Sequence, residues 1–118
     1  VLTCADAAAD VRDRLGAAAE VLDCSGADPG DVDPAAVLRV LTGRGLLRAL
    51  CEGGPTLLGT FVEHDLLDEL CLTSAPVLVG GAAPRIAAGP GQVLTRMRRA
   101  HLITDAEGYL YARYTRAS

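Results

Sequence analysis

The residues best suited to chemistry lie in one short turn, Glu52-Gly53-Gly54-Pro55-Thr56-Leu57. It joins an apolar run to an expected helix, and a helix start offers free backbone N–H groups and a positive dipole end to an anion. Two glycines let a phosphate approach the backbone, and proline presets the first helical φ. The threonine adds a hydroxyl donor. The turn therefore predicts phosphate binding, and a tight turn without a ligand is the alternative.

Glu52 has a different expected role from the rest of this turn. A carboxylate repels phosphate, but it accepts hydrogen bonds from the N–H or O–H groups of a ligand. The residue follows an expected strand, and open α/β sheets place ligands at the carboxyl ends of their strands. We therefore expect Glu52 to face a ligand without holding its phosphates.

The other basic side chains give weaker signals. Arginine suits bidentate phosphate recognition, but charge also blunts the exposed edge of a sheet. We favour the second interpretation for the cluster near the C-terminus and simple solvent exposure for the arginine of the glycine-rich loop. These residues are Arg96, Arg98, Arg99 and His101, and Arg85.

Composition excludes several classes of function. The net charge of −4 gives no basic field for nucleic acid or anionic membranes. All eleven basic residues are arginines, which excludes a Schiff-base or P-loop lysine. The two histidines are isolated, and the four cysteines lack metal-site spacing, so we expect no metal. Free, reduced thiols and the lack of a signal peptide or an apolar run of ~18 residues predict a cytoplasmic protein.

The elements around the turn follow an alternating order. Helices are expected over residues 6–19, from Pro34 after the N-cap Asp33, and for about ten residues from Pro55. Strands are expected over 1–3, 20–24, 46–51 and 69–74, followed by a loop over 77–91 and a hairpin of 98–104 with 109–114. This order predicts one α/β domain over residues 1–118, a three-layer α-β-α sandwich with a mostly parallel sheet and an antiparallel C-terminal hairpin.

Three stretches together carry a family resemblance: Leu50 to Leu57, Leu66 to Leu70, and Ala75 to Gly81. Their pattern, EGGPTL, then a hydrophobic pair before DEL, then P-x-L-x-G, resembles the C-terminal reductase domain of the riboflavin-biosynthesis deaminase–reductases (RibD C-terminal-like). The closing strand Tyr109 to Tyr114 also fits. The resemblance covers nearly the whole chain, but only the later half of the family's domain.

The resemblance implies a dihydrofolate-reductase-like fold and NADPH as the cofactor. Family members reduce the ribose of a ribosylaminopyrimidine phosphate to ribityl, and a homodimer is expected. By position, Glu52 would contact substrate. The cofactor's phosphates would be held by Gly53, Gly54, Pro55, Thr56 and Leu57.

Two further hypotheses stay open. One is an enzyme of the same fold with another substrate, such as a dihydropterin. The other is a non-catalytic remnant, an oligomerisation module or a generic nucleotide-binding module. The chain begins with the strand-like Val1-Leu2-Thr3 and no methionine, so we expect a fragment that lacks the N-terminal part of the domain. We expect no catalysis by these 118 residues alone.

Overall fold

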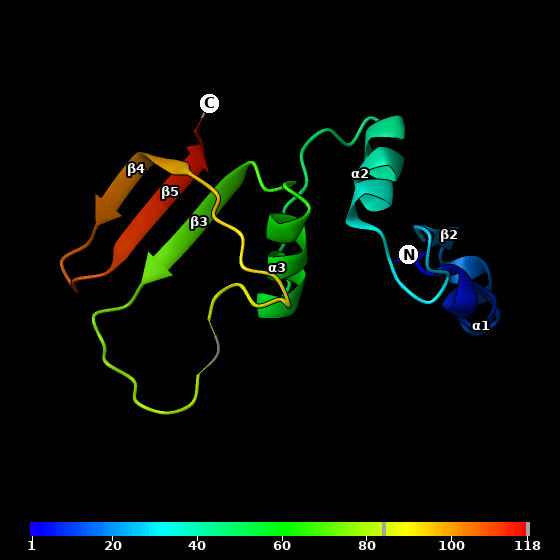
Figure 1. Ribbon diagram of the computed structural model, residues 1–118, viewed down its shortest axis with the longest axis horizontal. Coiled ribbons are helices and arrows are strands. Elements are labelled where there is room, and N and C mark those ends of the chain that lie inside the picture. Colours follow the sequence, from blue (N-terminus) through cyan, green and yellow to red (C-terminus); the bar gives the residue numbers. More distant parts are fainter. Residues whose placement is uncertain (84, 118) are drawn as a thin grey trace. The chain divides into compact units, whose positions relative to one another are not determined.

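The computed structural model describes residues 1–83 and 85–117. The chain divides into two compact units, Val1–Cys51 and Glu52–Ser118, and each is described by itself (Figure 1). Both units contain helices and strands, which confirms the α/β class. The assignment of residues 1–118 to a single domain stays a prediction.

The first unit is a small parallel α/β arrangement. Strand β1 (Leu2–Thr3) pairs in parallel with β2 (Leu22–Asp23), and helix α1 (Ala5–Leu15), with a short 3-10 turn η1 (Gly16–Ala18), connects them. Parallel neighbours need such a crossover. The buried apolar residues of the first unit come from its helices and from positions next to β2. They are small: Ala8, Val21, Cys24 and Ala36.

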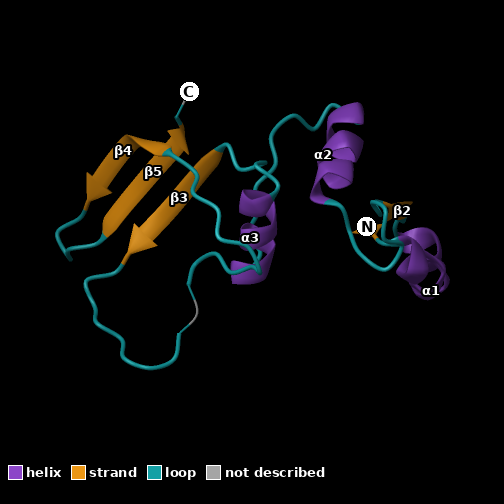
Figure 2. Cartoon of the chain, viewed as in Figure 1, coloured by secondary structure: helices purple, strands orange, loops and turns teal. Residues whose placement is uncertain are grey.

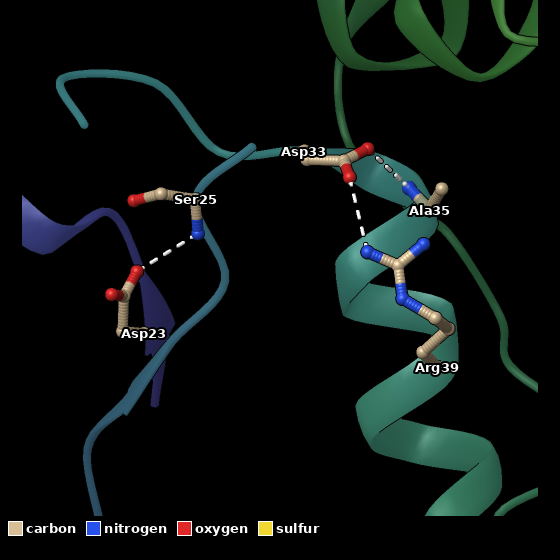
Figure 3. Close-up of polar contacts among 5 residues, drawn as sticks. All are labelled: Asp23, Ser25, Asp33, Ala35 and Arg39. Carbon is tan, nitrogen blue, oxygen red and sulfur yellow. Dashed lines mark hydrogen bonds and ion pairs between the residues drawn. The ribbon is translucent and has the colours of Figure 1, made fainter. Parts of the chain in front are cut away.

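Helix α2 (Pro34–Gly43) begins where the sequence predicts. The Asp33 side chain accepts a hydrogen bond from the backbone N–H of Ala35 at 2.8 Å, and Arg39 reaches the other carboxylate oxygen (Figure 3). The Ala35 bond, then Arg39, hold the pKa of Asp33 below its usual value. This contribution to stability is therefore present above the unfolded-state pKa and is lost as pH falls through the lowered folded-state pKa.

The expected central strand over residues 46–51 is wrong. Helix α2 ends at Gly43, the chain turns at Gly45, whose φ of +76° suits glycine, and the following segment is irregular. Leu46, Leu47 and Leu50 are 55%, 77% and 83% exposed. A strand exists only when a neighbour takes its backbone hydrogen bonds, and no described strand pairs with this run.

The prediction of a mostly parallel sheet is therefore also wrong. The described strands form a two-stranded parallel sheet and a three-stranded antiparallel sheet. Of the strands that were expected to be parallel, the run over 46–51 is unpaired, and Glu69–Ser74 pairs with Leu110–Arg116 in the antiparallel sense. The layering of the expected sandwich stays a prediction.

The second unit contains helix α3 (Pro55–Glu63) and an antiparallel sheet. Its strands β3 (Glu69–Ser74), β4 (Met97–Thr104) and β5 (Leu110–Arg116) lie in the order β3-β5-β4 (Figure 1). Leu70 and Arg99 both oppose Tyr114, and a register shift separates Arg99 from His101. The sequence prediction of these elements is confirmed within one or two residues.

The turn between β4 and β5 is fixed by its own side chains. Asp105 accepts from the backbone N–H groups of Glu107 and Tyr109, each at 3.0 Å, and from the Tyr111 hydroxyl at 2.9 Å. Gly108 has a φ of +90°, as expected for a glycine in this hairpin. Local turn chemistry therefore accounts for the hairpin.

The structure bears on two expectations, free cysteine thiols and the lack of a membrane-spanning helix. All four cysteines are free, as expected, but Cys51 and Cys71 are exposed whereas Cys24 is buried. Within residues 1–83 and 85–117, no helix has both the length and the apolar character to cross a membrane. The cytoplasmic location stays a prediction.

Candidate functional site: the turn before helix α3

The turn over Glu52–Leu57 is open to solvent. Glu52, Gly53, Gly54 and Thr56 are exposed, and Pro55 is half-buried. The prediction that α3 begins at Pro55 is confirmed, with Gly54 as its N-cap. The expected strand before Glu52 is absent, so this residue does not lie at a strand end.

The starts of α1 and α2 are filled by acceptors from the chain itself. At α1, the Ser25 hydroxyl oxygen accepts from Ala5 N–H at 2.7 Å, and the Pro29 carbonyl accepts from Asp6 N–H at 3.0 Å. At α2, the Asp33 carboxylate accepts a hydrogen bond from Ala35 N–H. Neither helix start has its leading donors free for a ligand.

The start of α3 differs because its leading donors have no acceptor. The Gly54 carbonyl accepts from Leu58 N–H at 3.1 Å, which closes the first helical turn. Within the described part of the chain, no acceptor faces the N–H groups of Thr56 and Leu57. These two amide donors and the helix dipole together suit an anion such as a phosphate.

The two glycines of the turn have distinct surroundings. A Cβ atom added at Gly53 would overlap the Leu57 side chain, whereas one added at Gly54 would meet nothing within 4 Å. Gly54 has φ −70° and ψ −174°, a conformation open to any residue. Glycine is therefore not required there by the backbone or by packing, and its bare face leaves room for a ligand to approach.

Glu52 is exposed and is not held by the fold. Its side chain is exposed and makes no hydrogen bond or ion pair with the residues that the structure describes. The next glutamate along the chain is Glu63, the last residue of α3. Its carboxylate accepts a hydrogen bond from the backbone N–H of Gly91, in the loop after β3. Of these two glutamates, only Glu63 is therefore held by a contact with the described residues.

The basic cluster near the C-terminus does not join this turn. Arg98, Arg99 and His101 lie on β4, which is an edge strand, and they are exposed. Arg96 precedes β4, and its carbonyl accepts from Ala117 N–H. These positions fit the interpretation as a charged sheet edge. Arg85 is exposed, as expected for a loop residue.

Sequence reasoning missed the contacts between α3 and the loop after β3. Ala88 N–H donates to the Pro55 carbonyl at 2.9 Å, and a Cβ atom at Gly59 would overlap the backbone of Ala88. Gly59 is the buried residue of α3. A glycine inside a helix costs about 1 kcal/mol relative to alanine, and that cost was the available signal of a close approach.

No metal centre appears in the described residues. Neither 1–83 nor 85–117 contains a group of three or more His, Cys, Asp or Glu side chains placed to hold an ion. The turn itself offers backbone amide donors, the hydroxyl of Thr56 and the carboxylate of Glu52.

A family model and a curated relative both relate this chain to RibD proteins. Residues 1–111 match the RibD C-terminal domain. The riboflavin biosynthesis protein RibD of Bacillus amyloliquefaciens is 39% identical over 56 residues, which are 47% of this chain and 15% of that protein. The chain thus spans a small part of this relative.

Solved structures show the same fold. A pyrimidine reductase-like protein from Corynebacterium diphtheriae matches 92% of this chain and 44% of its own, with TM-score 0.75 and 21% identity. Acinetobacter baumannii RibD (form 2) matches 92% of this chain and 29% of its own, with TM-score 0.67 and 20% identity. Because the family match covers residues 1–111 of 118, the chain belongs to the RibD C-terminal domain family.

Proposed function

We propose that this chain is the cofactor-binding part of an NADPH-dependent reductase that acts on a ribosylaminopyrimidine phosphate in riboflavin biosynthesis. Its family is one of NADPH-dependent pyrimidine reductases. The observation that carries the proposal is the start of α3, where Thr56 and Leu57 are exposed and no acceptor among the described residues faces their N–H groups.

The residues of the turn fit the phosphate groups of such a cofactor. The free N–H groups supply donors, the space beside Gly54 admits a phosphate oxygen close to the backbone, and the Thr56 hydroxyl is exposed. Pro55 fixes the first helical residue, and the Leu57 side chain covers Gly53. The rigid helix start therefore presents its donors in a fixed direction.

When bound, NADPH supplies the hydride from its nicotinamide ring. The chain's own residues then have to bind the cofactor and the substrate and orient them relative to one another. The amide groups at the start of α3 would fix the cofactor, and Glu52 would accept a hydrogen bond from a hydroxyl or N–H group of the substrate. Assembly as a homodimer stays a prediction.

The test of the proposed function is turnover of the natural full-length protein. Loss of NADPH absorbance should depend on the ribosylaminopyrimidine phosphate, and product analysis should find the ribityl compound. Turnover of a dihydropterin in its place would support the alternative substrate. If neither substrate is reduced and NADPH does not bind, the reductase proposal is wrong.

Replacing Glu52 with glutamine should lower turnover of the substrate and leave the affinity for the cofactor nearly unchanged. The amide keeps an acceptor oxygen but loses the charge, and hydrogen bonds to charged groups contribute ~1.5–3 kcal/mol against ~1 kcal/mol for neutral ones. We expect kcat/KM to fall roughly 2- to 30-fold while the Kd for NADPH changes less than about twofold. Steady-state kinetics and nicotinamide fluorescence titration measure the two quantities. Glu107→Gln, in the hairpin turn, is the matched control.

A drop in NADPH affinity for Glu52→Gln as large as the drop in turnover would contradict this assignment. It would place the carboxylate against the cofactor instead. Unchanged turnover would remove Glu52 from the reaction altogether.

A further inference from the structure

The loop after β3 returns to helix α3 (Figure 2). We name residues 87–91 of this loop the strap. Ala88 N–H donates to the carbonyl of Pro55, the first residue of α3, at 2.9 Å. Gly91 N–H donates to the carboxylate of Glu63, the last residue of α3, also at 2.9 Å. The strap is therefore attached at both ends of the helix and runs in the same direction.

The dimensions of the two segments agree with this attachment. Pro55 and Glu63 are eight steps apart, which is ~12 Å along a helix axis. Three residues from Ala88 to Gly91 reach ~10 Å at most when extended. A helical side chain leans toward the helix N-terminus, so the Glu63 carboxylate bridges the remaining distance.

Glycines allow the strap and the helix to approach so closely. A Cβ atom at Gly59 would overlap the Ala88 carbonyl, and a Cβ atom at Gly89 would overlap the Glu63 carboxylate. At Gly91 a Cβ atom would come within 3.3 Å of the same carboxylate. The strap therefore fits against α3 at its first, middle and last turns.

The Glu63 carboxylate is the charged group in this contact. The residue as a whole is half-buried, its hydrogen bond to Gly91 is exposed to solvent, and among the described residues no arginine or histidine forms an ion pair with it. A hydrogen bond from an amide to an ionised carboxylate is roughly twice as strong as a neutral one. Glu63 is thus the side chain that holds the C-terminal end of the strap.

The other end of the strap acts on the proposed phosphate site. The Pro55 carbonyl that Ala88 binds belongs to the same planar peptide group as the Thr56 N–H, and the two point in opposite directions. Fixing the carbonyl from one side therefore fixes the free donor on the other. Chains of hydrogen bonds also polarise one another, which strengthens the Thr56 donor.

We propose that Glu63 is a positioning residue that holds the strap on α3 and thereby aims the Thr56 N–H at the phosphate of the bound cofactor. This inference rests on the proposed function for its cofactor, but the attachment of the strap stands on its own contacts. Glu63 does not touch the cofactor in this account. It acts through Gly91 and Ala88.

Amide hydrogen exchange in the natural full-length protein, without NADPH, tests the attachment. Glu63→Ala should speed exchange at the Gly91 and Ala88 amides by roughly tenfold, since losing one hydrogen bond of this kind corresponds to about that factor. Glu63→Gln keeps an acceptor oxygen and should restore most of the protection. Amides within α1 should be unchanged in both variants, as should all amides in the control Glu107→Ala.

NADPH titration of the same variants tests the positioning role. Glu63→Ala should weaken NADPH binding about fivefold with kcat at saturation unchanged, and Glu63→Gln should restore affinity to within about twofold. Gly89→Ala, which displaces the carboxylate without removing it, should resemble Glu63→Ala. It serves as the second variant if Glu63→Ala folds poorly.

The outcomes separate the two claims. Unchanged exchange at Gly91 in Glu63→Ala would overturn the attachment. Faster exchange with unaltered NADPH affinity would overturn the positioning role and leave a purely structural contact. If the natural protein does not bind NADPH, the proposed function and the positioning role both fall, while the exchange rates still decide whether Glu63 holds the strap.

Discussion

Gly59→Ala should lower the free energy of unfolding by up to about 2 kcal/mol, because overpacking costs about 1–3 kcal/mol and the helix preference of alanine offsets about 1 kcal/mol of it. The added methyl group would overlap the carbonyl of Ala88, a backbone atom that cannot rotate away as a side chain does. Alanine favours helix over glycine by about 1 kcal/mol, so only a steric cost can give a net loss. Thermal or urea unfolding, followed by circular dichroism, measures the change.

Gly43→Ala is the matched control for this substitution. Gly43 is the last residue of α2, and a Cβ atom there meets nothing within 4 Å. The same chemical change should therefore be neutral or stabilising by up to ~1 kcal/mol. If Gly59→Ala is as stable as Gly43→Ala, the strap does not pack on α3 as described.

Gly54→Val should weaken NADPH binding roughly tenfold or more. The backbone of Gly54 is extended, with φ −70°, and the space beside it is empty, so valine fits the fold. The branched side chain would instead occupy the path by which a phosphate reaches the Thr56 and Leu57 amides. Loss of one or two charge-assisted hydrogen bonds costs ~1.5–3 kcal/mol each.

The stability of Gly54→Val separates this effect from misfolding. Glycine is a better N-cap than valine, so the free energy of unfolding should fall by no more than about 1 kcal/mol. Gly43→Val, at the last residue of α2 and outside the turn, should leave NADPH affinity unchanged. A Gly54→Val protein that binds NADPH as well as the natural one would show that the turn is only structural.

Local signals in the sequence predicted most helices and turns. The Asp33-Pro34 start of α2 and the Pro55 start of α3 are confirmed, because a cap and a preset φ act within a few residues. The glycine of the C-terminal hairpin has the positive φ that its turn requires, also for a local reason. The strand β3 was predicted with its observed bounds, Glu69–Ser74.

Partners distant in sequence could not be predicted in this way. The apolar run over 46–51 has the residue types of a buried strand, but residue type does not state which segment takes its hydrogen bonds. The attachment of Gly91 to Glu63 spans 28 positions and leaves no periodic pattern. At the candidate site, the turn itself was predictable, whereas the free donors of α3 became evident only beside the filled starts of α1 and α2.

Mapping NADPH onto individual amides tests the central claim most directly. Isotope-labelled natural protein, titrated with NADPH and followed by amide NMR, should show its largest shift changes at Gly53, Gly54, Thr56 and Leu57, with the Thr56 and Leu57 protons moving downfield as they gain an acceptor. The starts of α1 and α2, whose donors are already bound, should not respond. Saturable NADPH binding that leaves the Thr56 and Leu57 amides unshifted would contradict the account, because the cofactor would then bind somewhere other than the turn before α3.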